Sequence, residues 1–356
     1  MKLSDRSVTL EFSSEPPEED KQLRDSLSAI VRVGSELWLA SHERTRLERL
    51  SAKVGTTFGG HTSFLLSSLF SLPGGDDQEI DIEGLDCQDD AIWLVGSHSL
   101  KRGEPKKKDK TAEEKLGKLS SVKFEENRYT LARIPLEAEG QTGRRPSKAV
   151  PAALLPRTKN ANELMDALAE DKHLKRFFAV PGKDNGFDIE GLAVTGDRVF
   201  LGLRGPVLRG WALLLELEIE VHEKSRLQLS KIGSADRPYR KHFLPLRGLG
   251  IRELCILGTD LLILAGPTMD LDVPVKVFKW KNAIKTSGDS LVETSSLQEL
   301  FEVPFGQGND AGTDHAEGMT LFSNSESSAS LLVVYDAPAK ARKIDLSSVK
   351  ADVFEL

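Results

Sequence analysis

The sequence of 356 residues is poor in cysteine, in aromatic residues and in long apolar runs. Its two cysteines, Cys87 and Cys255, have no Cys-x-x-Cys spacing, so no zinc site of that kind exists and two buried free thiols are predicted. No apolar stretch is long enough to span a bilayer, and the first six residues lack the hydrophobic run of a signal peptide. We therefore expect a cytoplasmic protein that does not enter a membrane.

An excess of positive charge is also missing. The chain has 48 Lys and Arg against 55 Asp and Glu, a formal net charge of −7. Without a sizeable basic face, nucleic acid and anionic membrane surfaces are unfavourable partners. A small molecule or another protein remains as the expected ligand.

Two common catalytic motifs are absent as well. The sequence contains no Gly-x-Ser-x-Gly elbow and no phosphate-binding glycine-rich loop followed by Lys and Ser or Thr. Neither cysteine lies in an obviously reactive setting. These absences argue against nucleophilic catalysis by serine or cysteine and against a P-loop nucleotide site.

What the sequence does contain is a degenerate internal repeat. Asp-Ile-Glu-Gly-Leu occurs at residues 81–85 and again at 188–192, with weaker copies at 26–30, 250–254 and 315–319. Each copy is followed by a polar turn and an apolar run, at residues 36–40, 91–95, 199–203, 261–265 and 331–335. Short apolar runs joined by turn residues predict β-hairpins, and a repeat of this period is typical of a propeller. We expect an all-β fold.

The number of copies predicts a five-bladed β-propeller that forms a single domain over residues 1–356. The strand at about residues 7–12 should complete the last blade beside residues 349–356 and so close the ring. Segments with Pro precede four of the copies, and Pro favours an edge position in a sheet. We expect outermost strands at residues 69–74, 177–182, 242–248 and 301–306.

The spacing between copies is uneven, which leaves an alternative of six blades. The interval from Glu83 to Glu190 is nearly twice an ordinary blade length. We favour an insertion at residues 101–175, with a charged, solvated loop at 101–110, a strand at 127–134 and a short helix capped by Asn160.

The repeat core predicts a ring of polar side chains. The first strand of each propeller blade lines the central channel, so the third residue of each copy should face one axis. Those residues are Ser28, Glu83, Glu190, Arg252 and Glu317, and two positions earlier on the same strand face are Asp81, Asp188 and His315. The Gly or Ala that follows keeps the crowded inner edge free of bulk, and Glu253 breaks this rule, which predicts a different local backbone in the fourth copy.

Three carboxylates around one channel repel each other, by about 2 kcal/mol per pair at ~8 Å and an effective dielectric of ~20. Arg252 can offset this repulsion, as can proton uptake by one glutamate or a bound divalent cation. Calcium is the first choice of cation, held by Glu83, Glu190 and Glu317, with Asp81 or Asp188 completing the shell. Alternatively, the three glutamates accept backbone N–H bonds from neighbouring blades and are a structural clamp.

The Asp-x-Glu-Gly-Leu cores, together with residues 248–254 and 262–267, resemble an uncharacterised bacterial propeller family of unknown function over residues 26–338. More remotely, the cores are similar to esterase-like phytase and calcium-dependent lactonase propellers. The lactonase resemblance implies a metal ligand at Glu83, Glu190 and Glu317. Arg252 and Ser28 depart from that pattern.

Two classes of function follow from these residues. In the first, the cation activates water for hydrolysis of an ester, lactone or phosphoester, Arg252 steadies an anionic group, and His98 or His315 is the general base. In the second, the Glu/Arg ring is structural, and the protein binds a ligand or a partner protein without catalysis, through the 101–175 insertion.

Overall fold

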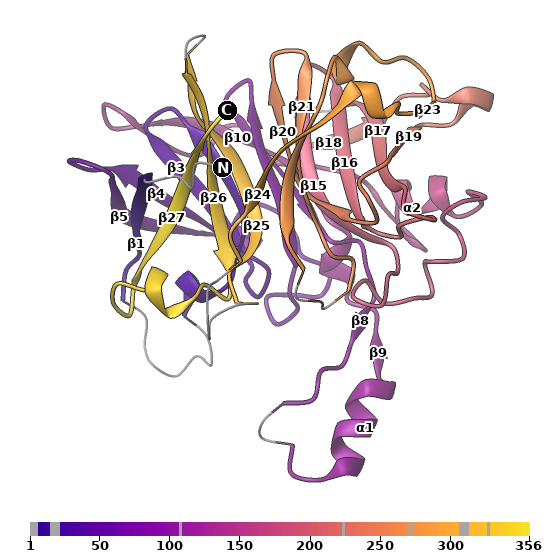
Figure 1. Ribbon diagram of the computed structural model, residues 1–356, viewed down its shortest axis with the longest axis horizontal. Coiled ribbons are helices and arrows are strands. Elements are labelled where there is room, and N and C mark those ends of the chain that lie inside the picture. The colour runs from indigo at the N-terminus through magenta and orange to yellow at the C-terminus, as the bar shows by residue number, and fades with distance from the viewer. Residues whose placement is uncertain are drawn as a thin grey trace.

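The computed structural model describes residues 6–14, 22–106, 109–222, 225–269, 271, 273–305, 313–325 and 328–356. Within these residues the protein is all-β, with mostly antiparallel sheets and two short α-helices outside them (Figure 1). No helix in this described part is long and apolar enough to cross a membrane.

Most strands belong to antiparallel runs that each begin at a copy of the repeat. The first run is β2 (Leu27–Val33), β3 (Glu36–Ser41), β4 (Arg46–Ala52) and β5 (Thr57–Leu65). The next is β6 (Ile82–Gln88), β7 (Ala91–Gly96) and β10 (Leu131–Glu139), with β11 (Gly143–Pro146) and β12 (Ala153–Leu154) on β10. Then come β15 (Asp188–Thr195), β16 (Arg198–Gly205), β17 (Ala212–His222) and β19 (Arg240–Leu244), with β18 (Arg226–Leu229) also on β17 and β23 (Ser290–Leu291) on β19.

The last two runs complete the set. One is β20 (Gly250–Leu257), β21 (Asp260–Gly266), β22 (Val275–Trp280) and β24 (Leu297–Val303). The other is β25 (His315–Ser325), β26 (Ser328–Asp336), β27 (Ser348–Glu355) and β1 (Arg6–Glu11). The N-terminal strand thus lies in the sheet of the C-terminal strands, paired from Arg6 with Val353 to Glu11 with Ser348.

The first strands of these runs contact each other in a closed cycle. β2 lies against β6, β6 against β15, β15 against β20, β20 against β25, and β25 against β2. The hydrophobic clusters lie between neighbouring runs, and each draws its side chains from two of them. This arrangement is propeller-like and surrounds a channel lined by first strands.

A β-bulge occurs at every copy of the repeat. In β6, Glu83 has no partner in the register with β7. In the other first strands the residue left without a partner on the second strand is Ser28, Glu190, Arg252 or Glu317. A bulge leaves the extra residue outside the ladder and re-aims its side chain. The repeated core is therefore the sequence of a bulge that turns one polar side chain toward the channel.

The glycine after the bulge is required by close approach. A Cβ on Gly84 would lie 2.6 Å from Leu192 Cβ, and one on Gly191 would lie 2.9 Å from Leu254 Cγ. The fourth copy has Glu253 instead, yet its bulge between Ile251 and Glu253 has the same form as the others. The expectation of a different backbone there was wrong, because the bulge does not depend on the glycine.

Several predicted outer segments differ from the structure. Residues 69–74 and 177–182 form turns and bends and belong to no strand, whereas 242–248 and 301–306 overlap β19 and β24. Gly306 lies outside the described residues. The expected strand at 127–134 begins only at Leu131, after a 3-10 turn over Glu126–Tyr129.

The insertion contains the expected short helix, α2 (Glu163–Leu168), but its cap is Asn162 rather than Asn160: Asn162 Oδ1 accepts from Met165 N at 3.0 Å. Two further small ladders, β8 (Lys101–Arg102) with β9 (Val122–Lys123) and β13 (Arg157–Thr158) with β14 (Ala161–Asn162), lie in the same insertion.

The charged loop of the insertion forms an arm that projects from the body (Figure 1). It consists of β8, α1 (Ala112–Ser120) and β9. The loop expected at 101–110 includes the two residues of β8, and α1 follows it at a place where the sequence pattern predicts no element. A capping box formed by Thr111 and Glu114 begins α1. No residue of α1 is buried, and residues 107 and 108 lie outside the described part.

Candidate functional site

The bulged side chains and the strand-end residues beside them meet at one end of the channel. In the described part of the chain the carboxylates there are Asp81, Glu83, Asp188, Glu190, Glu317 and Asp336. The arginines among them are Arg128, Arg204 and Arg252. The structure thus brings together the predicted metal ligands and Arg252, with more carboxylates than arginines.

Two arginines hold the central glutamates. Arg204 pairs with Glu190 through Nη1, and the same nitrogen lies 3.8 Å from Asp188 Oδ2. Arg252 Nη1 lies 2.6 Å from Glu317 Oε1, and its Nε lies 3.5 Å from Glu190 Oε2. Buried charges need partners of this kind. Arg252 is therefore an ion-pair partner within the ring.

The third arginine, Arg128, comes from the 3-10 turn before β10. It pairs with Asp81, and its Nε donates to Ser99 O at 3.1 Å. Burial alone raises the pKa of Asp81, but the charge of Arg128 holds it below the ordinary value. Asp81 itself has φ of +55°, a left-handed conformation, just before β6.

The remaining carboxyl groups carry the charge surplus. Burial, and then the charges of Asp81 and Glu190, raise the pKa of Glu83 well above its usual range. Burial likewise raises the pKa of Asp188 to about 7, although Arg204 opposes the shift. No arginine or lysine of the described residues lies within ion-pair distance of Glu83. Proton uptake and arginine pairing both offset the repulsion expected from the sequence.

Three residues at this end have the composition and spacing of metal ligands. One ligand atom from each of His42, Glu317 and Asp336 lies within 4.8 Å of the others. His42 follows β3, Asp336 ends β26, and Glu317 is the bulged residue of β25. Asp336 Oδ1 is buried without a hydrogen-bond partner. Burial alone lowers the pKa of His42, but Glu43, Asp336 and Glu317 together raise it to about 9.

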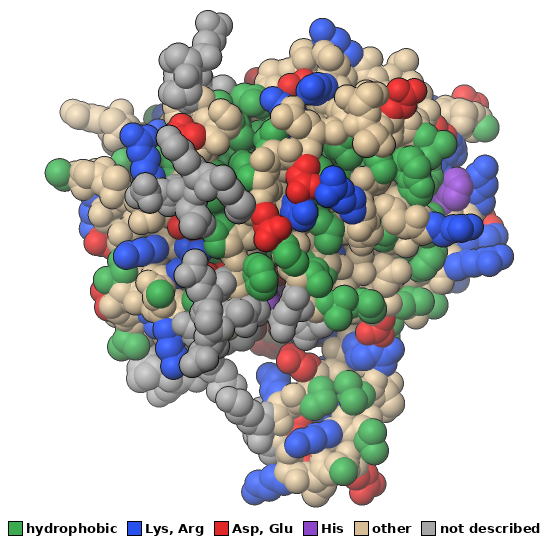
Figure 2. Space-filling model, viewed as in Figure 1, with side chains coloured by type: hydrophobic (Ala, Val, Ile, Leu, Met, Phe, Trp, Pro, Cys, Tyr) green, Lys and Arg blue, Asp and Glu red, His purple; other side chains and the backbone are tan. Residues whose placement is uncertain are grey.

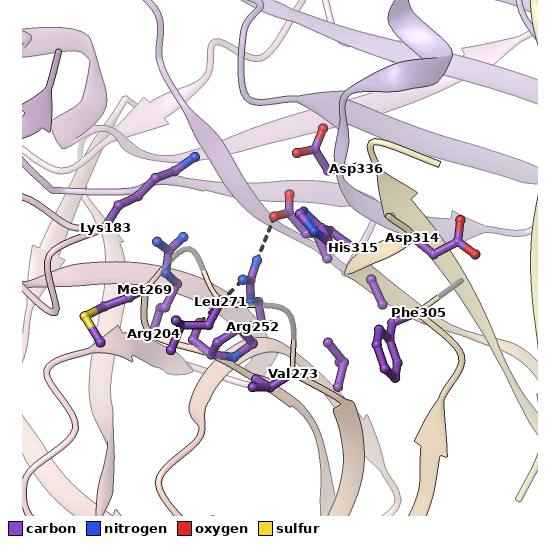
Figure 3. A pocket seen from close by; sticks show the side chains of 14 residues that line it. Lys183, Arg204, Arg252, Met269, Leu271, Val273, Phe305, Asp314, His315 and Asp336 are labelled. Carbon is purple, nitrogen blue, oxygen red and sulfur yellow. Dashed lines mark hydrogen bonds and ion pairs between the residues drawn. The ribbon is translucent and has the colours of Figure 1, made fainter. Parts of the chain in front are cut away.

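A pocket opens beside these ligands (Figure 3). Its polar lining is Lys183, Arg204, Arg252, Asp314, His315, Glu317 and Asp336. Its apolar lining is Pro267, Met269, Leu271, Val273, Val275, Phe305 and Ala316. Figure 3 shows Lys183 and Asp336 on opposite sides of the view, with the amino end of Lys183 pointing toward the centre. The end of the channel is therefore a concave site with one charged wall and one apolar wall.

The two histidines proposed as general bases differ in position. His315 lines the pocket next to Glu317. His98 is 1% exposed, and its ring nitrogens contact Gly96 O at 2.7 Å and Asn162 Nδ2 at 2.8 Å. Burial lowers the pKa of His98 to about 4. With both nitrogens occupied inside the protein, His98 is a neutral structural residue and not a base at the channel mouth.

Three side chains on the first strands, one of them the bulged Ser28, bond neighbouring runs together. Ser28 Oγ donates to Ile82 O at 2.5 Å, and Val194 N donates to Asp86 Oδ2 at 2.6 Å. Leu192 N donates to Glu253 Oε1 at 3.1 Å. The N–H-accepting clamp considered for Glu83, Glu190 and Glu317 is thus formed by Asp86 and Glu253, whereas Ser28 donates to a carbonyl.

The site also contains Arg128, Lys183, His42, Arg204 and Asp336, none of which was among the expected ligands or catalytic residues. The last three share a signal, because each lies at the end of a second strand, next to the bulge of its own hairpin. Arg128 has no such signal, since it comes from a turn in the insertion.

The fold and the site define an all-β, propeller-like protein with a charged channel end. The sequence of residues 26–352 matches the family described as "Protein of unknown function (DUF3616)", and the chain belongs to that family. This agrees with the resemblance inferred from the Asp-x-Glu-Gly-Leu cores. No curated protein matches the sequence.

Solved structures with similar chain paths have low identity to this protein. A xylan β-1,4-xylosidase from Bacillus halodurans C-125 is 11% identical with a TM-score of 0.45, over 94% of this chain and 54% of that one. This chain thus spans about half the length of the xylosidase. The catalytic domain of a GH62 α-L-arabinofuranosidase from Coprinopsis cinerea is 9% identical with a TM-score of 0.42, over 99% and 97%. A streptogramin B lyase is 9% identical with a TM-score of 0.37, over 100% of both chains.

Proposed function

We propose that this protein is a five-bladed propeller hydrolase that holds a divalent metal ion with His42, Glu317 and Asp336. Its substrate is an ester, lactone or phosphoester bound in the adjoining pocket. The observation that carries the proposal is the convergence of these three ligand atoms within 4.8 Å at the wall of a concave pocket. A metal ion at such a place polarises the scissile group and activates water.

The blade number is supported by the cycle of first strands, in which each of β2, β6, β15, β20 and β25 has its most extensive contacts in the group with the first strands of the two neighbouring runs. A sixth blade would need its own run of strands between β7 and β15. The additional strands described in the insertion are β8, β9, β11, β12, β13 and β14, and apart from the four-residue β11 each has two residues. Such strands are too short to bury a blade face.

The ligand set differs from the one expected from sequence alone. Glu190 is committed to Arg204 and Arg252, whereas Glu317 uses Oε1 for Arg252 and keeps Oε2 for another partner. An imidazole nitrogen also changes the preferred ion, because calcium favours oxygen ligands and histidine favours zinc or manganese-like ions. We therefore place zinc or manganese before calcium.

The protein residues have separate tasks in hydrolysis. Arg252 is a positioning residue, because its N–H groups hold Glu317 and Pro267 O. His315 accepts a proton from the attacking water as the water oxygen bonds to the carbonyl or phosphoryl centre, and it returns that proton to the leaving oxygen as the ester bond breaks. Lys183 donates to the oxygen on which negative charge develops.

Elemental analysis and calorimetric titration of zinc and manganese test this ligand set. We expect near-stoichiometric metal in the wild type, at least tenfold weaker binding in His42→Gln and Asp336→Asn, and unchanged binding in Glu83→Gln. Glu83 is a matched control because it lies in the same channel outside the ligand group. Loss of metal in Glu83→Gln but not in Asp336→Asn, or a folded wild type that binds neither ion, overturns the proposal.

A second candidate, protein binding without catalysis, is favoured by the arm. Residues 101–123 carry nine Lys and Arg against four Asp and Glu in a chain of net charge −7. Leu116 and Phe124 are 65% and 52% exposed, and Figure 2 shows apolar side chains beside lysines on the arm. Such a surface suits an acidic protein partner with an apolar patch.

The arm can be tested by itself. The test uses metal-free protein and a purified, acidic partner. Binding by the wild type at low salt, release at high salt and no binding by a variant without residues 103–121 would establish this second function. Equal binding with and without the arm rejects it.

A further inference from the structure

The pocket beside the candidate metal ligands has an apolar wall that hydrolysis as such does not require. Met269, Leu271, Val273 and Phe305 line one side (Figure 3), and Val275 belongs to the same apolar lining. Val275 is buried against the core, but Met269 and Leu271 are 44% and 51% exposed. A bound molecule that covers these two side chains gains ~25 cal/mol for each Å² of apolar surface removed from water.

The polar wall limits the charge of that molecule. Arg204 and Arg252 are neutralised by Glu190 and Glu317, so their guanidinium groups offer little net positive charge to the pocket. Glu83 and Asp188 add carboxyl groups behind this wall, and Asp336 adds another at the ligand group. Among the described lining residues, Arg204 and Arg252 form ion pairs, whereas the ammonium group of Lys183 has no carboxylate within ion-pair distance.

A dianionic phosphate is disfavoured by this balance. The pocket lining offers a dianion one ammonium group, because Arg204 and Arg252 are paired with Glu190 and Glu317, and Asp336 repels a second negative charge. A neutral carbonyl has no such penalty and still accepts a hydrogen bond from Lys183. The charged wall thus fits a polar, uncharged reacting group.

We propose that the ligand of this pocket is a neutral amphipathic carboxylic ester or lactone with an apolar chain. The carbonyl group lies at the His42, Glu317 and Asp336 side, and the chain covers Met269 and Leu271. This inference rests on the proposed hydrolase function for its reaction, but its binding prediction does not need turnover.

Alkyl amides test the binding prediction, because an N-methyl amide has the polarity of an ester and is not readily hydrolysed. Calorimetric titration of N-methyl butanamide, hexanamide and octanamide should give affinities that rise up to about fourfold per added CH₂, from ~0.8 kcal/mol per buried CH₂. Leu271→Asp and Met269→Ser should remove the dependence on chain length. Leu291→Asp is the control, because Leu291 is 68% exposed on β23 and does not line the pocket.

Hexyl phosphate is the second ligand of the test. We expect it to bind more weakly than N-methyl hexanamide. Affinity independent of chain length, or hexyl phosphate binding more tightly than the amide, overturns the inference.

The outcome separates the two proposals. Chain-length-dependent amide binding by a protein that holds no metal supports the ligand class and refutes the hydrolase. Turnover of short esters with no dependence on chain length supports the hydrolase and refutes the ligand class.

Discussion

At the scale of single residues, the channel end is controlled by carboxyl groups that differ in their partners. Glu190 contacts two arginines, whereas Glu83 has its pKa raised well above the ordinary range by burial and by Asp81. The two glutamates occupy the same position of the repeat, so the difference comes from their neighbours. Removing the charge of each should therefore have opposite effects on stability.

Glu83→Gln should stabilise the protein at pH 8 by at least about 1 kcal/mol, since each unit by which folding raises a carboxyl pKa costs ~1.4 kcal/mol above that pKa. The cost of Glu83 is absent below its unfolded pKa and grows as pH rises toward its folded pKa. Urea unfolding from pH 4 to 8 should show a smaller loss of stability with rising pH in Glu83→Gln than in the wild type. If the free energy of unfolding falls with pH as steeply in Glu83→Gln as in the wild type, the excess of carboxyl groups over arginines does not destabilise the channel end.

Glu190→Gln is the opposing case. It leaves Arg204 and Arg252 with fewer anionic contacts inside the protein, and breaking a buried pair typically costs about 3 kcal/mol or more. Urea unfolding at pH 7 measures the difference. Equal stability of Glu190→Gln and the wild type would show that this glutamate does not hold the arginines.

At the scale of the elements, the repeated bulge determines how closely neighbouring first strands approach. The glycine after the bulge leaves the space that the next run fills, as Leu192 does beside Gly84. Side chains such as Asp86 then reach the backbone of the adjacent strand. The close contact and these hydrogen bonds both depend on the short distance between neighbouring first strands.

Gly84→Ala should destabilise the protein by about 2 kcal/mol or more, because the added Cβ would lie 2.6 Å from Leu192 Cβ and 3.0 Å from Leu192 N. Gly117→Ala is the control, since nothing lies within 4 Å of its Cβ and no residue of α1 is buried. Thermal unfolding should show a lower Tm for Gly84→Ala and an unchanged Tm for Gly117→Ala. Similar Tm values for both variants would contradict the close packing.

At the scale of the whole molecule, the ends of the chain close the cycle while the arm lies outside it. β1 lies between β27 and β5, and its Val8 and Leu10 are buried. The arm contacts the body at its base, through the ion pairs of Arg102 with Asp184 and of Lys101 with Glu79. Cooperative stability should therefore depend on β1 and not on the arm.

Deletion of residues 1–12 should lower Tm by 10 °C or more and promote aggregation, because it removes buried apolar side chains and exposes the edges of β27 and β5. Replacement of residues 103–121 by a two-residue turn should leave Tm within about 2 °C. Differential scanning calorimetry and light scattering measure both effects. A stable, monomeric protein without β1 would show that closure does not depend on this strand.

The sequence by itself determined the all-β fold, the repeat and the polar residue at each bulge, because these depend on a short local pattern. It also identified Glu317 as a ligand candidate and Arg252 as an ion-pair partner. Only the tertiary structure decided the partners of each charge: Arg128 reaches Asp81 from a turn in the insertion, and His42 meets Glu317 across the junction of the first and last runs. Such contacts join residues far apart in the chain, and their distances follow from the closed cycle of strands rather than from any local pattern.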